Sequence, residues 1–221
     1  MNVEQARFNM IEQQIRPWEV LDANVLDLLA VVRREDYLPV ALRHLAFVDM
    51  QLPLREGGAR GQCMLEPKVE ARLLQTLHLQ RHESVLEIGT GSGHMAALLA
   101  HRAQQVLTVD IVAELADAAA SRLASCGVTN VRVLTRDGAL GMPGQAPFDA
   151  IVLSGSVAEV PQRLLAQLKV GGRLIAVIGD EPMMRATLVE RLDDDDYRQT
   201  VLFDTVAPRL LGFDEPSRFR F

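Results

Sequence analysis

The chain is poor in cysteine: Cys63 and Cys126 are its only two among 221 residues. Neither has the neighbouring cysteine or histidine of a zinc site, and two cysteines do not make the disulfide framework of a small secreted domain. We therefore expect no metal site, and a reducing, cytoplasmic setting.

Long apolar runs are also missing, because no stretch approaches the ~20 residues that cross a bilayer. Residues 1–5 lack the basic segment and apolar core of a secretory signal, so we expect no membrane partner. Basic residues are outnumbered, with 23 Lys and Arg against 29 Asp and Glu and a formal net charge of −6. This balance argues against a general nucleic-acid binder, and we expect no nucleic-acid partner.

What is present is a globular composition, with 48% hydrophobic and 24% charged residues. Residues 3–32 have helical spacing that breaks at Pro17, and Asp22 is a good N-cap for a second helix. Residues 47–61 look irregular, and Pro67 suits the first turn of a helix that runs to about residue 77. We expect residues 1–80 to pack, as N-terminal helices and an acceptor loop, on a core formed by residues 81–221, in one globular unit.

Short apolar runs alternate with helical or loop-like segments from residue 84 onward. We predict strands at residues 85–88, 105–109, 131–134, 150–153 and 174–178. Such alternation is typical of an α/β protein with a mostly parallel sheet and helices on both faces. Beyond residue 181 we predict a helix around residues 183–192, a solvated turn at the four aspartates 193–196, and a strand or two within residues 197–211.

The most informative stretch is VLEIGTGSG at residues 85–93, a buried strand that ends in an acid and three glycines at alternate positions. Glycine allows a backbone to approach a nucleoside-bearing ligand closely. Asp110 closes the second strand and is placed to accept hydrogen bonds from two ribose hydroxyls, while Asp137 follows the third and is placed to accept one from an adenine amino group. Glu87 adds negative charge where a sulfonium would lie, so these acids favour S-adenosylmethionine.

NAD is the alternative cofactor, because residues 91–96 match the pattern G-x-G-x-x-A and Asp110 lies near the expected distance. The additional Gly89, the acid at Glu87 and the lack of an obvious hydride-transfer pair count against NAD.

Five segments resemble the protein-L-isoaspartate O-methyltransferase family. They are VVRREDYLP at residues 31–39 (family P-R-E-x-F-V-P), AFVDMQLPL at 46–54 (A-Y-x-D-x-P-L-P-I), VLEIGTGSG at 85–93 (the same in the family), APFDAI at 146–151 (A-P-F-D-x-I) and QLKVGGRL at 167–174 (Q-L-x-x-G-G-R-L). The resemblance implies a Rossmann-like class I methyltransferase fold with S-adenosylmethionine as cofactor. It also implies methylation of a carboxylate in damaged proteins, and it places the cofactor on Glu87, Gly89, Thr90, Gly91, Gly93, Asp110, Ile111, Asp137 and Gly138.

The chain departs from the family in the acceptor loop, which reads G-x-T-I-S-Q-P in the family. Cys63 stands in place of the threonine and Leu65 in place of the serine whose hydroxyl engages the isoaspartyl carboxylate. Leucine has no hydrogen bond to donate. A small buried thiol is the expected state of Cys63, in preference to a nucleophile.

Two further departures concern His94 and the C-terminal segment. His94 replaces a frequent tyrosine and is expected at an acceptor or cofactor edge or at the surface. TVAPRL at residues 205–210 only echoes the family's V-R-F-V-P-L. The acceptor is therefore a protein or peptide carboxylate, a different small molecule in a divergent methyltransferase, or none in a non-catalytic S-adenosylmethionine-binding protein.

Overall fold

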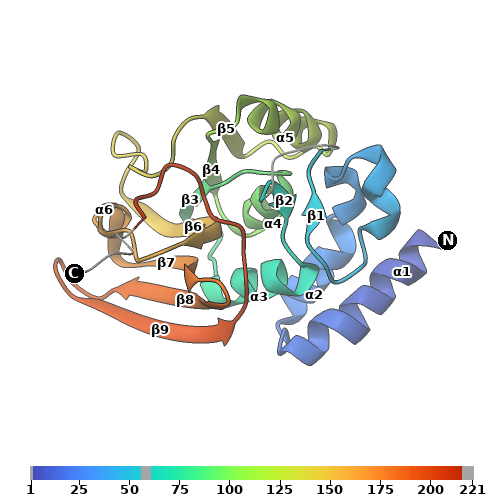
Figure 1. The fold of residues 1–221 in the computed structure, drawn as a ribbon, viewed down its shortest axis with the longest axis horizontal. Helices are drawn as coiled ribbons and strands as arrows, with labels where there is room; N and C mark the ends of the chain where they lie inside the picture. Colours follow the sequence, from blue (N-terminus) through green and yellow to red (C-terminus); the bar gives the residue numbers. More distant parts are fainter. Residues whose placement is uncertain (1, 56–60, 216–221) are drawn as a thin grey trace.

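A computed structural model describes residues 2–55 and 61–215 (Figure 1). A seven-stranded sheet with the order β5-β4-β3-β6-β7-β8-β9 runs through its centre. The parallel strands β3 to β7 span Ser84–Ile88, Gln105–Asp110, Val131–Thr135, Phe148–Val157 and Leu168–Asp180. The predicted strands and the predicted α/β class are confirmed, and the order places β3 beside both β4 and β6.

The two faces of the sheet are covered unequally. Residues of one parity, such as Val85 and Val152, join the larger apolar core with α3, α4 and α5. These helices span Pro67–Leu77, His94–Arg102 and Ala113–Ser125. Residues of the other parity, such as Leu86 and Ile151, join a smaller core with the one-turn helix α6 at Gln162–Leu165. Flanking helices are therefore present on both faces, with most of the helical mass on one.

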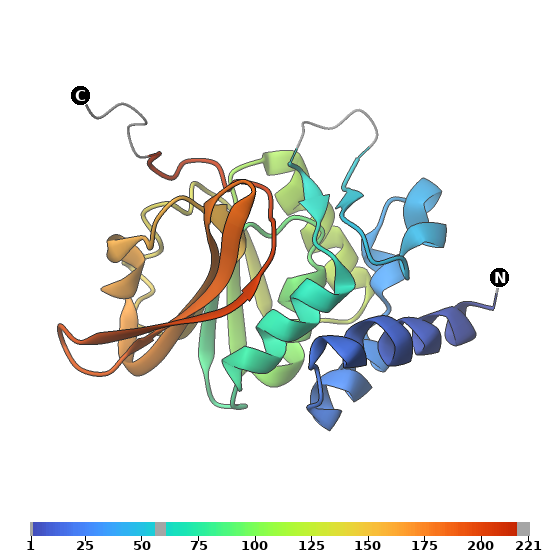
Figure 2. The same ribbon diagram turned by 60° about the horizontal axis from the view of Figure 1, so that its bottom comes forward.

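The N-terminal region is helical as predicted. It contains α1, the π-helical turn η1, the 3-10 turn η2 and α2, at Val3–Met10, Ile11–Ile15, Arg16–Trp18 and Ala23–Val31. The break falls at Pro17, and the side chain of Asp22 accepts a hydrogen bond of 2.9 Å from the backbone N–H of Asn24. The short turns η3 and η4 follow at Arg34–Tyr37 and Val40–Leu45. Helix α2 packs on α3, and Figure 2 shows α3 lying across the sheet.

The segment expected to be irregular contains a small ladder. Strand β1 at Leu52–Pro53 pairs antiparallel with β2 at Cys63–Met64. This ladder fixes the predicted acceptor loop at its C-terminal side. The glycine-rich part of the segment, residues 56–60, lies outside the described residues.

The predicted helix at residues 183–192 is wrong. Met183–Arg191 forms strand β8, which pairs antiparallel with β7 over eight residue pairs. Met, Arg, Ala, Leu and Glu favour a helix by intrinsic propensity, but the hairpin partner decides here. The burial pattern shows this, because Met184, Ala186 and Val189 are buried while Met183 is exposed. The four aspartates form the predicted exposed turn before β9 at Tyr197–Asp204, a strand that was predicted correctly.

The chain after β9 returns to the carboxyl end of the sheet. The N–H of Leu210 donates to the carbonyl of Ser156 at 2.9 Å, and the N–H of Ser156 donates to the carbonyl of Pro208 at 2.7 Å. In the part of the chain that the structure describes, no helix is long and apolar enough to span a membrane. The same residues contain no cluster of three or more His, Cys, Asp or Glu side chains suited to a metal ion.

Candidate active site

The turn after β3 is built from glycines in the left-handed region. Gly89, Gly91 and Gly93 have φ values of +92°, +52° and +86°. The N–H of Gly89 donates to the carbonyl of Val109 at 2.8 Å, which holds the turn against β4. An ideal Cβ on Gly89 would lie 2.8 Å from Cδ2 of Leu210, so backbone, without side chains, meets the pocket here.

Asp110 lies beside this turn at the end of β4. Its Oδ2 accepts from the N–H of Gly91 at 2.8 Å, and its Oδ1 accepts from the N–H of Val112 at 3.0 Å. Each carboxylate oxygen keeps a further lone pair, because an ionised carboxylate has about four acceptor positions. The arrangement holds the carboxylate rigidly at the pocket wall with capacity left for two hydroxyl donors.

Glu87 is fully buried at the end of β3. The hydroxyls of Ser154 and Thr108 donate to its two oxygens at 2.7 Å each. Burial raises the pKa of Glu87 to about 8; the two hydroxyls offset part of this rise, and the negative charges of Glu70 and Asp110 add to it. The group therefore holds a proton near neutral pH and loses it readily when positive charge comes close.

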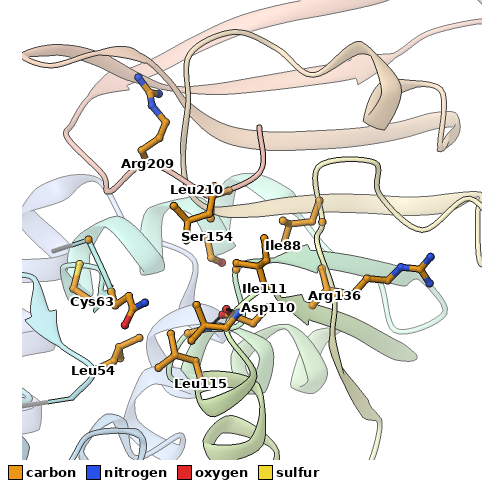
Figure 3. A pocket seen from close by; sticks show the side chains of 18 residues that line it. Leu54, Cys63, Ile88, Asp110, Ile111, Leu115, Arg136, Ser154, Arg209 and Leu210 are labelled. Atoms are coloured by element: carbon orange, nitrogen blue, oxygen red, sulfur yellow. Dashed lines mark hydrogen bonds between the residues drawn. The ribbon is translucent and has the colours of Figure 1, made fainter. Parts of the chain in front are cut away.

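A pocket opens at the carboxyl ends of β3, β4 and β6 (Figure 3). Its wall contains the glycine turn, Asp110, Ile111 and Gly138, the Cys63 loop, and Arg209 with Leu210 from the C-terminal segment. Its free volume is ≈ 80 Å³. Pockets that enclose a whole small-molecule ligand have roughly 300–1,000 Å³, so this pocket is smaller than one that encloses a nucleoside-sized ligand.

The predicted acceptor residues lie against this pocket and a smaller one beside it. Cys63 lines both, and Leu65 lines the second, which has a volume of ≈ 30 Å³. Burial raises the pKa of Cys63 to about 11, and the charges of Glu66 and Glu70 contribute, so the thiol is protonated and donates to Oε1 of Gln51 at 3.4 Å. The half-buried, protonated thiol is a hydrogen-bond donor and not an activated nucleophile.

The remaining predicted residues are only partly brought together. Thr90 lines the small pocket, and its hydroxyl lies 2.6 Å from that of Thr108. Gly93 caps α4 and lies close to Ala119, so its place is structural. Asp137 lines a neighbouring hollow beside Gly212 and accepts from the N–H of Ala139 at 2.9 Å, so the described lining of the main pocket does not include it.

Two side chains near the site, Ser154 and Glu70, were not predicted. Ser154 partners Glu87, and its signal was available, because an acid at the end of a buried strand needs donors nearby. His94 is 1% exposed, which corrects the expectation of a surface position, and the described linings of these two pockets do not include it. Its partner Glu70 comes from α3, 24 residues away, and no local pattern reveals that contact.

The comparisons with known proteins decide the family. The family model described as "Protein-L-isoaspartate(D-aspartate) O-methyltransferase (PCMT)" matches residues 5–207. The chain belongs to this family. It is 41% identical over 204 residues to protein-L-isoaspartate O-methyltransferase of Rhodopseudomonas palustris, covering 92% of each chain. It is 44% identical over 160 residues to that of Myxococcus xanthus, covering 72% of this chain and 74% of the relative.

Solved structures agree on the fold. A Plasmodium falciparum chain named as a beta-aspartate methyltransferase (PCMT), solved in complex with S-adenosyl-L-homocysteine, has a TM-score of 0.77 at 17% identity, covering 95% of this chain and 99% of that chain. A second protein-L-isoaspartate O-methyltransferase has a TM-score of 0.75 at 22% identity, and the match covers 92% of this chain and 66% of that chain. The chain is a class I, S-adenosylmethionine-dependent methyltransferase of the PCMT family. The glycine cradle, which a Cβ at Gly89 would fill, fits that cofactor.

Proposed function

We propose that this protein methylates isoaspartyl carboxylates in proteins or peptides. The observation that carries the proposal is the shared wall of the two pockets, which joins the glycine turn to the Cys63 loop at the place where donor and acceptor have to meet. The 41% identity to a curated isoaspartyl methyltransferase over 92% of both chains supports it.

The cofactor side of this proposal assigns a contact to each predicted residue except Gly93, which supports the turn from its place against Ala119. Gly89, Thr90 and Gly91 present backbone, and Asp110 accepts from the ribose hydroxyls with Ile111 packed beside it. Gly138 lies close to the adenine, and Asp137 reaches its amino group once the C-terminal segment moves. Glu87 faces the methionine part of the cofactor.

The chemistry demands positioning more than acid–base catalysis. The bound cofactor supplies a methyl group on a positively charged sulfur. An isoaspartyl carboxylate is ionised at neutral pH and needs no general base. What this chain has to do is hold that oxygen in line with the methyl carbon and keep water out. Apolar walls formed by Leu54, Met64 and Leu65 suit that task.

Leu65 is also the observation that favours a second candidate, a methyltransferase with another acceptor. Without the family's serine hydroxyl, a charged acceptor loses one hydrogen bond, which is worth ~1.5–3 kcal/mol, or roughly ten- to a hundredfold in rate or affinity. An acceptor with less charge loses less binding free energy when leucine replaces the serine. A non-catalytic S-adenosylmethionine-binding protein is the third candidate.

One paired assay separates the three candidates. Labelled S-adenosylmethionine is incubated with an isoaspartyl peptide and with the matched aspartyl peptide, while calorimetry measures cofactor binding on the same preparation. Base-labile label on the isoaspartyl peptide alone, increased by Leu65→Ser and reduced by Asp110→Asn at subsaturating cofactor, is the expected result. Cofactor binding without peptide labelling would overturn the isoaspartyl assignment, and labelling of a cell extract then distinguishes another acceptor from no transfer.

A further inference from the structure

Three buried ionisable side chains connect the acceptor loop to the glycine turn. Arg34 begins η3, Glu70 lies in the first turns of α3, and His94 is the first residue of α4. Their exposed fractions are 2%, 4% and 1%. Burying three such groups is costly, so their arrangement calls for an explanation.

The contacts form a continuous chain. The guanidinium of Arg34 donates through Nη2 to the backbone carbonyl of Leu65 and through Nη1 to Oε2 of Glu70. The same Oε2 lies 3.0 Å from Nδ1 of His94. The backbone N–H of His94 donates to the hydroxyl of Ser92, within the glycine turn, at 3.1 Å.

The direction of each bond follows from charge. Burial alone would raise the pKa of Glu70, but Arg34 and His94 more than offset it and lower the pKa below its usual value. Glu70 is therefore a carboxylate with no proton to give, and Nδ1 of His94 is the donor. This leaves Nε2 of His94 buried and without a hydrogen-bond partner in the described structure. The only side-chain hydrogen bond that orients the imidazole in the described structure is therefore the one from Nδ1 to Glu70, and the ring of Tyr37 packs against it edge-on with centroids 5.4 Å apart.

Stability does not explain the network. Buried ion pairs are often no more stable than apolar side chains of the same volume, and their best-attested use is to fix one arrangement among several. Here the ends of the network are the two walls of one chamber, because Leu65 and Glu70 line the small pocket together with Gly91 and Ser92. A misplacement of 1 Å between reacting groups can cost about a hundredfold in rate.

We propose that Arg34, Glu70 and His94 are positioning residues that set the acceptor loop at Leu65 against the glycine turn, and so align acceptor with methyl donor. The loop is held through its backbone carbonyl at the position where the family has a serine side chain. The rate effect rests on the proposed function, whereas the coupling between loop and turn does not.

The test compares His94→Leu, which removes the Nδ1 donor, with His94→Asn, whose amide nitrogen replaces it. Glu83→Gln serves as a control, because it perturbs a partly buried ion pair with Arg173 outside the pockets. We expect His94→Leu to lower kcat on the isoaspartyl peptide by roughly a hundredfold, with KM and the Kd for S-adenosylhomocysteine unchanged. His94→Asn should retain most of kcat, and Glu83→Gln should change stability only.

A second measurement needs no acceptor. Hydrogen exchange is followed at the backbone of residues 61–66 with and without S-adenosylhomocysteine. We expect the ligand to protect this loop in the wild type and in His94→Asn, but not in His94→Leu at saturating ligand. If His94→Leu fails to fold, Arg34→Lys replaces it, because lysine lacks the planar fork with which the guanidinium binds Leu65 and Glu70.

The outcomes separate the two proposals. Absence of peptide methylation by every form, with loop protection still dependent on His94, refutes the isoaspartyl function alone. Equal loop protection in His94→Leu and the wild type, or a kcat that falls only with the folded fraction, overturns the positioning role.

Discussion

Glu87→Gln should remove a large pH dependence from the stability of this protein. Glu87 is fully buried, and that burial raises its pKa to about 8 from an ordinary value of 4.5. Between these values the folded chain holds a proton that the unfolded chain has lost. The free energy of unfolding therefore falls as pH rises. The stabilisation that comes from the proton on Glu87 is fully present below pH 4.5 and is lost as the pH rises from there to about 8.

The magnitude follows from one proton. Each pH unit in this window changes the free energy of unfolding by up to about 1.4 kcal/mol, so from pH 5.5 to 7.5 the wild type should lose about 2.5 kcal/mol through this group. Glutamine has nearly the same shape, and its amide can still pair with the hydroxyls of Ser154 and Thr108, but it does not titrate. The variant should therefore lack this part of the slope.

Urea unfolding at pH 5.5, 6.5 and 7.5 measures the difference, provided that the m values agree between the two proteins. Parallel pH profiles for the wild type and Glu87→Gln would refute a proton on Glu87. Calorimetry in buffers of different ionisation enthalpy adds a ligand control. Near pH 7, S-adenosylmethionine should release more protons from the wild type than S-adenosylhomocysteine does, because only the first carries a sulfonium, and Glu87→Gln should remove the difference.

Three further substitutions test the site and its support. Asp110→Asn should weaken cofactor binding by calorimetry by roughly ten- to a hundredfold, since hydrogen bonds to a charged group are lost, and an unchanged Kd contradicts the ribose contact. Gly89→Ala should lower the free energy of unfolding by about 1–3 kcal/mol, because φ is +92° and the new Cβ lies 2.8 Å from Leu210; adding Leu210→Ala should recover part of the loss, and an unchanged melting curve counts against the strain. Arg173→Met should lower the free energy of unfolding by about 3 kcal/mol. The guanidinium of Arg173 binds the carboxylate of Glu83 at 2.6 and 2.8 Å, and the substitution leaves that carboxylate without its cation. Arg173 keeps the pKa of Glu83 low, so this contribution is present above pH 4.5 and the gap from wild type should narrow as pH falls further.

The parallel part of the fold was predictable because its signals are local. Each strand is a short apolar run, and the glycine turn after residue 88 forces a strand–turn–helix unit. Pro67 and Asp22 predicted helix starts correctly for the same reason: a missing N–H and a capping carboxylate act within one turn. Strand β8 was missed because its residues favour a helix and only the partner β7 makes it a strand.

The candidate site shows the same division between residues with a local sequence signal and residues whose partners only the tertiary fold supplies. Glu87, Gly89 and Asp110 were predicted from their place at strand ends, and the structure brings them to one edge of the sheet. The Arg34–Glu70–His94 network was not predictable in this way. Its members lie 36 and 24 residues apart, and each has an ordinary local context. Long-range pairs of this kind become visible only when the tertiary fold packs η3, α3 and α4 together.

The division between donor and acceptor sides also bears on how such a chain changes substrate. The donor side is built from strand ends of a buried sheet, where Glu87 is fully buried and the glycine turn is held against β4 through the carbonyl of Val109, so both tolerate little change. The acceptor side is a loop held by one short ladder and by the guanidinium of Arg34 on a backbone carbonyl. A carbonyl contact is indifferent to the side chain at that position, so Leu65 can replace the family's serine without releasing the loop. The positioning network therefore separates where the acceptor loop lies from which acceptor its side chains recognise, and a change of acceptor needs no change in how the methyl donor is held.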